Sequence, residues 1–516
     1  MSRSPRIHAH MIAGQHGSRC TYPVRAVRAS SWRRRKSCNG GLRLCARCRG
    51  GPRAEDTSRV MCPPVMSPND LTAVSRFRAG DVGSSETRRT KSIGRSRRWM
   101  LPALIAIAYI VLQIIGKPTL APANDAYRYN QAALQLLGDS PEQAHRTALK
   151  AYCHDKVRRE SRSHGLKPEN LRDDAAPYPT PGKGFSACMA ESADGLKPVS
   201  PRYERIFEVR PGFPVLAAPF VAVFGAGSGL LVTSVLFTVV GGLVAYLLLR
   251  AVGAPARIAL LGQAFFYACP IGWWGGYPLT EGPVLALIMT SLLGAWWLFH
   301  RRLTAGTILL TGSMVVGTAV KYSTFLLIAG ALAAAAMVCL VLVAGTRHRG
   351  TYLMAALNTA VVLGIGALST HYNLPGSTET LQDTFTDHFA QPDVAEPWPM
   401  LVELNGIYWT HWIQEQVRSP WLIAAVGLGA WGLFRHSRAL GWIVLAVGLT
   451  GIATEIAHPV DSQGDRLMLN VWVIAVLGLP LLLHQLIQGR MDREKVPQLP
   501  VDSTAPDSRP VSQSAH

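Results

Sequence analysis

The chain has 516 residues, a formal net charge of +20 and a hydrophobic fraction of 48%. Residues 1–100 hold 22 Lys or Arg against 5 Asp or Glu, whereas residues 101–516 hold 30 against 27. The basic first fifth is rich in Arg, Ser and Gly and poor in apolar side chains, so it cannot bury a hydrophobic core. We predict that residues 1–97 are a disordered region, or come from a misassigned start, and that the net charge marks no nucleic-acid partner.

Ten apolar runs within residues 98–489 approach the length of about 20 residues that a membrane-spanning helix needs. They are Trp99–Gly116, Ser228–Leu249, Ala256–Trp273, Glu281–Phe299, Ala305–Val320, Thr324–Ala344, Thr351–Ser369, Pro420–Phe434, Ala439–Ile456 and Leu467–Ile487. The sequence therefore predicts an all-α polytopic membrane protein with about ten transmembrane helices, in a range of about nine to twelve. Pro211–Phe224 is apolar but short and broken by proline, which predicts a re-entrant or interfacial helix.

Two long polar segments, 117–227 and 370–419, interrupt these spans, and residues 490–516 form a predicted disordered tail. With the N-terminus placed in the cytoplasm, the four short loops that fall on the cytoplasmic side all hold Arg and no acid: 250–257, 300–302, 346–350 and 435–438. Short cytoplasmic loops are enriched in Lys and Arg. We therefore predict a multi-pass protein of the bacterial plasma membrane, with both termini cytoplasmic and both long polar segments outside.

Cys153 and Cys188 both lie in the first of these extracytoplasmic segments. They are the cysteines that the predicted topology places outside, where an oxidising compartment allows disulfides to persist. We predict a disulfide between them.

Asp125 follows the first span within the run Asn-Asp-Ala-Tyr-Arg-Tyr, residues 124–129. The residues after it have helical periodicity, so its carboxylate lies near a helix N-terminus and near the membrane surface. One interpretation is that Asp125 only caps this helix. The other is that it is a catalytic carboxylate.

Two further clusters hold candidate substrate-binding residues. Glu208 and Arg210 precede Pro211–Phe224, and charges this close to a bilayer boundary are either solvated anchors or part of a site. A guanidinium such as that of Arg210 suits a phosphate. Tyr277 belongs to a Trp- and Tyr-rich loop, and Glu281 opens the next span; the carboxylate either compensates the helix dipole or faces the hydroxyls of a sugar.

The last candidates are Lys321 and Tyr322, between two apolar runs, and His458 and Arg466, around the last outer loop. Lysine at a helix end often only extends toward the interface, but lysines are otherwise scarce on this face. Histidine and carboxylates in the last loop match no compact metal-ligand spacing. The sequence therefore requires no cofactor, and a divalent metal is the less favoured interpretation.

The order of these motifs resembles the GT-C superfamily of glycosyltransferases, and within it the branch of the protein O-mannosyltransferases and the lipid A aminoarabinose transferase. The similar features are the acid in Asn-Asp-Ala-Tyr, the run Arg-Pro-Gly-Phe-Pro from residue 210, Tyr-Pro-Leu-Thr-Glu from 277, Val-Lys-Tyr-Ser from 320 and Asp-Arg-Leu from 465. They span about residues 98–487 in the same order. One departure is Ala126, where the family often has a second acid.

The resemblance implies a transferase that uses a polyprenyl-phosphate sugar and inverts the anomeric carbon. Asp125 would then be the base for an acceptor hydroxyl of a lipid, glycan or protein, and Arg210, Lys321 and Arg466 would bind the departing phosphate. Glu281 would hold sugar hydroxyls. The main alternative is a transporter or flippase of lipid-linked sugars, although such proteins often carry internal repeats and charge at the bilayer midplane, and neither is evident here.

Overall fold

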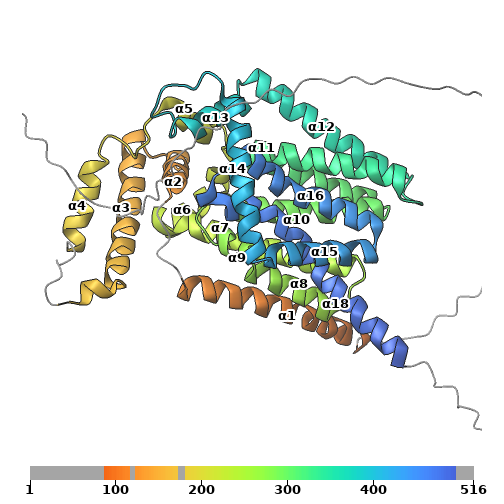
Figure 1. Cartoon of the computed structure of the whole chain (residues 1–516). Helices are drawn as coiled ribbons and strands as arrows, with labels where there is room; N and C mark the ends of the chain where they lie inside the picture. Colours follow the sequence, from red (N-terminus) through yellow and green to blue (C-terminus); the bar gives the residue numbers. More distant parts are fainter. Residues whose placement is uncertain (1–85, 117–122, 173–179, 495–516) are drawn as a thin grey trace, which may run out of the picture. The chain divides into compact units, whose positions relative to one another are not determined.

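The computed structural model describes residues 86–116, 123–172 and 180–494. Within these residues every regular element is a helix, in agreement with the predicted all-α class. Most of the long helices run side by side, and a group of shorter helices lies at one end of them (Figure 1). The predicted disordered N-terminal region up to residue 85, with its cysteines, and the tail from residue 495 lie outside the described residues.

Among the described residues, six helical stretches are long and apolar enough to cross a membrane. They are α7 (Ala226–Ala251), α10 (Glu281–Phe299), α11 (Leu303–Leu342), α12 (Arg349–His371), α16 (Arg438–Ala457) and the stretch Gly464–Arg490, which holds most of α18 (Trp472–Glu494). The number rises to eight if two bent pairs each form one span. The pairs are α5 (Pro201–Glu208) with α6 (Gly212–Phe224), bent by 78°, and α14 (Pro397–Arg418) with α15 (Trp421–His436), bent by 84°. These stretches support a polytopic membrane protein, and the count of about ten stays a prediction.

Helix α11 covers two of the ten predicted spans in one element of 40 residues. A straight α-helix of that length would be about 60 Å long. Yet Gly306, near its start, and Gly350, beyond its end, both pack against Leu298 of α10. The element therefore folds back on itself, and its backbone leaves helical geometry at Lys321 (φ −158°, ψ 79°).

One predicted span, Ala256–Trp273, is wrong as a single helix. Helix α8 (Ala256–Ala268) ends before Cys269, and α9 (Pro270–Gly275) is a separate short helix. Proline disfavours helical geometry in the residue that precedes it. Cys269 accordingly has an extended backbone (φ −83°, ψ 176°), and the chain turns there.

Helical structure also extends past both predicted borders of the membrane part. Helix α1 is Glu86–Ile115, so residues 86–97 are helical rather than disordered, and α18 continues to Glu494, beyond residue 489. Neither extension contains proline, and Arg, Lys, Glu and Met favour a helix. The apolar part of α1, Trp99–Ile115, corresponds to the first predicted span but is shorter than the six stretches above.

Helix α10 forms the centre of the bundle, where it packs between α7 and α11. In its most apolar window 83% of the residues are buried. A helix that is apolar on all sides belongs in such a position. Small residues allow other helices to approach closely, as where Gly429 of α15 meets Gly478 of α18 backbone to backbone; close contact of this kind is typical of packed membrane helices.

The shorter helices at one end of the bundle come from the two polar segments and from the chain that leads into α18 (Figure 1). They are α2 (Asn124–Leu136), α3 (Pro141–Gly165), η1 (Pro168–Leu171), α4 (Pro181–Glu191), α13 (Ser377–Phe385), η2 (Asp461–Gln463), α17 (Gly464–Leu467) and η3 (Met468–Val471). The structure contains the predicted disulfide between Cys153 of α3 and Cys188 of α4, with a Cα–Cα distance of 5.7 Å.

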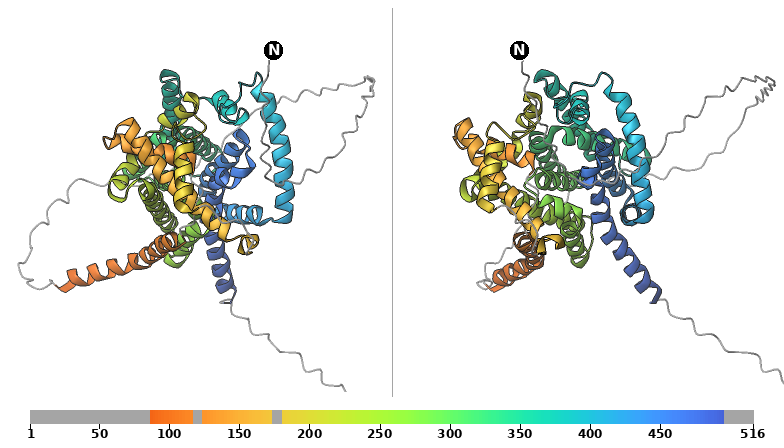
Figure 2. Two further views of the ribbon diagram at one scale, coloured as in Figure 1. Left: turned by 90° about the vertical axis from the view of Figure 1, so that its left-hand side faces the viewer. Right: turned by 60° about the vertical axis from the view of Figure 1, so that its left-hand side comes forward.

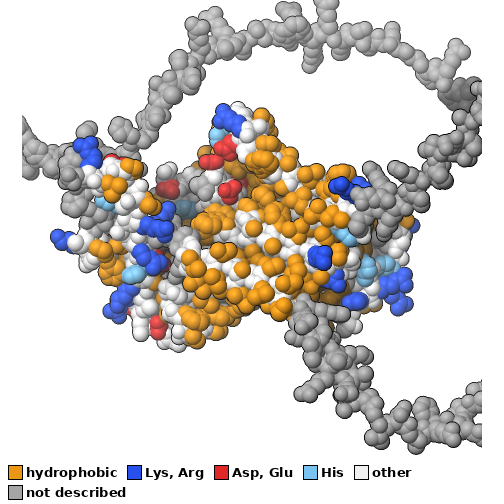
Figure 3. Space-filling model, turned by 90° about the horizontal axis from the view of Figure 1, so that it is seen from below, with side chains coloured by type: hydrophobic (Ala, Val, Ile, Leu, Met, Phe, Trp, Pro, Cys, Tyr) orange, Lys and Arg blue, Asp and Glu red, His pale blue; other side chains and the backbone are white. Residues whose placement is uncertain are grey.

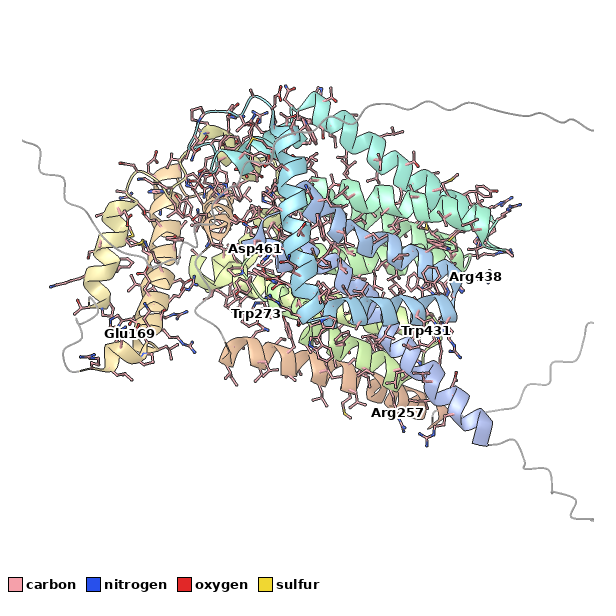
Figure 4. The ribbon with its side chains drawn as sticks, in the orientation of Figure 1. Glu169, Arg257, Trp273, Trp431, Arg438 and Asp461 are labelled. Carbon is pink, nitrogen blue, oxygen red and sulfur yellow. A yellow bond between two sulfur atoms is a disulfide. The ribbon has the colours of Figure 1, made fainter. Side chains whose placement is uncertain are left out.

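Hydrophobic and charged side chains divide the surface into zones. Figure 3 shows a broad hydrophobic band, with Lys, Arg and His at its right-hand border on the face in view. Arg257 and Arg438 lie at this basic end, whereas Asp461 and Trp273 lie toward the other end and Glu169 beyond them (Figure 4). Helix α14 runs across the direction of the bundle helices near that second end (Figures 1 and 2). This zoning agrees with the charge asymmetry of the predicted topology, while the sidedness itself stays a prediction.

Candidate functional site

An ionic cluster joins three elements that are far apart in the sequence. Arg466, on the short helix α17, donates through Nε to Oε1 of Glu281 on α10 at 2.7 Å. Its Nη2 donates to Oδ2 of Asp125 on α2 at 3.1 Å. The three side chains are only 16%, 7% and 25% exposed, respectively. A planar guanidinium with several fixed donors suits such bridging of two carboxylates.

Lys321 completes this cluster from the interruption of α11. Its Nζ lies 3.7 Å from Oε1 of Glu281, the same oxygen that Arg466 binds. The interruption matters because it places the Lys321 ammonium group where the chain reverses, instead of on the apolar surface of a helix. A cavity of about 40 Å³ lies among Glu281, Lys321, Arg466, Thr454 and Asn470. These residues come from five elements, α10, α11, α16, α17 and η3, which thus meet around one small cavity.

Arg210 enters the same neighbourhood from the turn before α6. Gly212 packs against the backbone of Ala319 and Val320, next to the α11 interruption, at a distance that leaves no room for a Cβ atom. Arg210 is close enough to Tyr129 and Lys321 to interact with both. Burial raises the pKa of Tyr129 to about 12, and the Arg210 charge opposes that rise.

The Nε atom of Arg210 is buried and has no hydrogen-bond partner among the described residues. A buried charged donor without an acceptor is costly, so such an atom calls for an explanation. The cluster holds three cations (Arg210, Lys321 and Arg466) against two carboxylates (Asp125 and Glu281). These five side chains alone therefore sum to one net positive charge, and Asp383 is a further carboxylate nearby.

Arg128 fixes the helix that carries Asp125. It lies one turn further along α2 and is 3% exposed. Its guanidinium forms an ion pair with Glu204 at 2.8 Å, donates to the carbonyl oxygen of Pro198 at 2.8 Å and stacks over Tyr203 at 4.5 Å. A buried arginine with several bonded partners holds its helix in one orientation. Asp125 therefore projects from a rigid support.

A second set of polar residues from α13 and the following loop lies close to this cluster. His388 donates through Nδ1 to Oδ1 of Asp383 at 3.0 Å, and the hydroxyl of Thr384 forms a hydrogen bond with Nδ1 of His458 at 2.8 Å. Both histidines interact electrostatically with members of the ionic cluster, His388 with Asp125 and His458 with Lys321 and Arg466. The hydrogen bond to Asp383 raises the pKa of His388, whereas burial lowers the pKa of His458.

The loop that carries His388 is conformationally strained. Asp387, His388 and Phe389 have φ values of 49°, 60° and 63°, in the left-handed region that non-glycine residues rarely adopt. Three consecutive residues of this kind persist only where surrounding contacts hold them, and such strain gathers at functional sites. The His388 ring packs 4.8 Å from that of Tyr203, which provides one such contact. None of these residues was assigned a role from the sequence.

The structure brings five predicted site residues together and leaves Tyr277 and Glu208 apart from them. Tyr322 donates to the carbonyl oxygen of Pro375 at 2.6 Å and so tethers a loop, and it lies close enough to Arg210 to interact with it. Tyr277 makes its described ring contacts with Trp273 and Trp274. Glu208 is exposed at the end of α5 and has no ion pair in the described part of the chain. Its role in binding a substrate stays a prediction.

The capping interpretation of Asp125 does not describe its contacts. Ala123 is the residue that precedes the first turn of α2, and Asp125 lies within that turn. Its carboxylate binds Arg466 instead of a backbone N–H of its own helix. His458 belongs to the neighbouring polar set described above, in which Thr384 of α13 forms a hydrogen bond with it.

Among residues 86–116, 123–172 and 180–494, no group of three or more His, Cys, Asp and Glu side chains has an arrangement that would hold a metal ion. Comparison with protein-family models, with curated proteins and with solved structures finds no match for this chain.

Proposed function

We propose that the chain is a membrane glycosyltransferase that moves a sugar from a polyprenyl-phosphate donor to an acceptor hydroxyl at the extracytoplasmic face. The observation that carries this proposal is the partnerless, buried Nε of Arg210 in a cluster whose three cations outnumber its two carboxylates. A phosphodiester anion supplies both the missing acceptor and the missing negative charge. Arginine and lysine together are the usual means of binding such a group.

The change in charge during the reaction favours the same assignment. A polyprenyl-phosphate sugar carries one negative charge, and the departing phosphate monoester gains a second as the bond to the sugar breaks. Preorganised cations stabilise charge that develops in the transition state. Arg210, Lys321 and Arg466 would therefore stabilise the transition state more than the bound donor, which is the condition for catalysis.

Asp125 is the proposed base. Among the described contacts Arg466 binds only its Oδ2, which leaves Oδ1 to take the proton of the acceptor hydroxyl. The acceptor oxygen then bonds to the anomeric carbon while the bond from that carbon to the phosphate oxygen breaks, with inversion. Glu281, held by Arg466 and Lys321, has a second oxygen, Oε2, that is buried without a partner and would accept from a sugar hydroxyl.

The lipid part of the donor would lie against α6 and the neighbouring spans. Val215, Val223 and Phe224 on this helix are apolar and more than half exposed. Arg210 directly precedes the same helix, so a prenyl chain along α6 would bring its phosphate to the cluster. Apolar side chains next to a cationic end match the two ends of such a lipid.

The direct test incubates membranes that contain the protein with radiolabelled polyprenyl-phosphate mannose and related sugar donors, and follows label into protein and lipid. We expect transfer by the wild type and a loss of at least about a hundredfold in Asp125→Asn, as for removal of a general base. Asp194→Asn is the matched control, because Asp194 is an exposed acid in the same polar segment. Full transfer by a folded Asp125→Asn protein would refute the base assignment, and lipid flipping without any transfer would favour the transporter.

A further inference from the structure

A second, larger cavity of about 640 Å³ lies beside the ionic cluster, between the C-terminal half of α14 and the segment from Asp461 to Trp472. Its volume falls within the range of about 300–1,000 Å³ that is usual for small-molecule sites. Five aromatic rings line it: Trp274, Tyr408, Trp412, Trp421 and Trp472. Such a density of flat rings provides surfaces on which another ring can stack.

The charged residues of this cavity have the opposite balance to the ionic cluster. Glu415, Asp461 and Asp465 line it together with one guanidinium, that of Arg418. His411 also lines it and lies 3.3 Å from Glu415, so this carboxylate has a partner on its own helix. A net negative lining disfavours a phosphate, which the adjacent cationic cluster attracts.

A further carboxylate lies behind the wall of the cavity. Glu455 is fully buried, and neither of its oxygens has a hydrogen bond of ordinary geometry. It lies beside the hydroxyl of Tyr408 and next to Gly464, both of which line the cavity. Asp461 and Asp465 are close enough to interact with it. The Tyr408 hydroxyl is its nearest donor, so Glu455 helps to hold the Tyr408 ring in place at the cavity wall.

The cavity is directly connected to the proposed reaction site through the chain. Asp465 lines the cavity, and the next residue, Arg466, holds Asp125 and Glu281. Trp274 precedes the loop that leads to Glu281. Figure 4 shows Asp461 and Trp273 near α14 at the same end of the bundle. Two neighbouring compartments thus differ in charge, one suited to phosphate and the other to a donor-rich, uncharged or cationic molecule.

We propose that this cavity binds a phosphate-free carbohydrate: sugar rings stack on Tyr408 and Trp412, and hydroxyl or amino groups donate to Asp461 and Asp465. Its role as the acceptor pocket, which would make the acceptor a glycan, rests on the proposed transferase function. Carbohydrate binding itself does not, because it follows from the aromatic and acidic lining alone.

The test measures binding by saturation-transfer NMR, with the full chain in lipid nanodiscs. The probes are maltotriose, the fully deacetylated chitosan trimer and glucose 1-phosphate. We expect maltotriose, the chitosan trimer or both to bind the wild type, with an affinity about tenfold lower in Trp412→Ala, as for loss of a central aromatic anchor. Trp431→Ala is the matched control, because Trp431 is an exposed tryptophan of α15 and does not line the cavity. Trp412→Phe keeps an aromatic ring and should retain binding, so it tests the same residue even if the alanine variant folds poorly.

Glucose 1-phosphate serves to separate the two compartments. Its binding should be insensitive to Trp412→Ala and should fall in Lys321→Ala, with the reverse pattern for maltotriose and the chitosan trimer. Binding of neither phosphate-free sugar, or equal binding by wild type and Trp412→Ala, would overturn the pocket assignment. Asp125→Asn should keep the sugar binding, so failure of the transferase proposal and failure of the pocket proposal give different results.

Discussion

The bridging role of Arg466 gives the most specific prediction about stability. Arg466→Ala removes one partner of a buried ion pair and leaves Glu281, which is 7% exposed, with Lys321 at 3.7 Å as its remaining cation. Breaking a buried pair in this way costs about 3–5 kcal/mol because a charge is stranded away from water. Lys321 still compensates part of that charge, so we expect the lower end, about 3 kcal/mol. That is more than a hundredfold in the unfolding equilibrium.

The assay is reversible unfolding in mixed micelles with increasing dodecyl sulfate, followed by circular dichroism. Arg202→Ala is the matched control, because Arg202 also bonds two carboxylates, Glu379 at 2.6 Å and Asp393 at 2.7 Å, but is 40% exposed. Exposed pairs contribute less than about 1 kcal/mol. We therefore expect the two alanine variants to differ by about 2 kcal/mol or more.

A double variant separates stranded charge from lost packing. If the cost in Arg466→Ala comes from an unpaired carboxylate, then adding Asp125→Asn should recover part of it, because Asp125 has no second ion pair among the described residues whereas Glu281 keeps Lys321. If the cost comes from lost side-chain volume, the second change should only add to it. Equal stability of Arg466→Ala and Arg202→Ala, or no recovery in the double variant, would refute the reasoning.

Three other predictions concern the structure around the site. Cys153→Ser opens the loop closed by the disulfide, whose ends are 35 positions apart, and should destabilise the α3–α4 pair by about 3–4 kcal/mol, seen as faster proteolysis there than in wild type under oxidising conditions. The hydrogen bond to Asp383 raises the pKa of His388. The stabilisation of the strained loop by this residue is therefore present below about pH 6.5 and is lost as pH rises through the pKa of the folded state. Hydrogen exchange of the loop amides should then speed up with pH by more than the intrinsic rate does, and His388→Gln should abolish this additional pH dependence. Gly212→Ala places a Cβ about 2.6 Å from the α11 backbone and should lower both the thermal midpoint and transfer, whereas Gly330→Ala, which has open space, should leave both unchanged.

The sequence predicts well what depends on local composition. Apolar runs locate the long helices, and the charged Lys321 between two such runs marks the point where α11 leaves helical geometry. Apolar composition and length are properties of a short stretch, so hydropathy reports them. The same criterion fails where one residue overrides it: Pro270 divides the third predicted span, although the run around it is apolar throughout.

The meeting of the site residues in space depends on the tertiary fold and not on local composition. Asp125 and Arg466 are 341 positions apart, and nothing in either local pattern specifies that they meet. Their order in the chain resembled a known family, which is why both were selected in advance. Asp383 and His388 were not selected, because a loop with three consecutive left-handed residues and no glycine has no sequence signature. Only packing against Tyr203 and the neighbouring helices defines that geometry.

The ionic cluster also bears on the choice between transferase and transporter. Alternating access moves one group of helices against another around a central site. Here Arg466 ties α2, in the polar segment, to α10, at the centre of the bundle, while Lys321 ties the reversal of α11 to the same carboxylate. Separating these elements would break buried ion pairs at a cost of about 3–5 kcal/mol for each stranded charge. A site held this rigidly suits chemistry on a lipid-bound substrate that approaches from one side, because positioning the reacting groups lowers the barrier only when they stay in place.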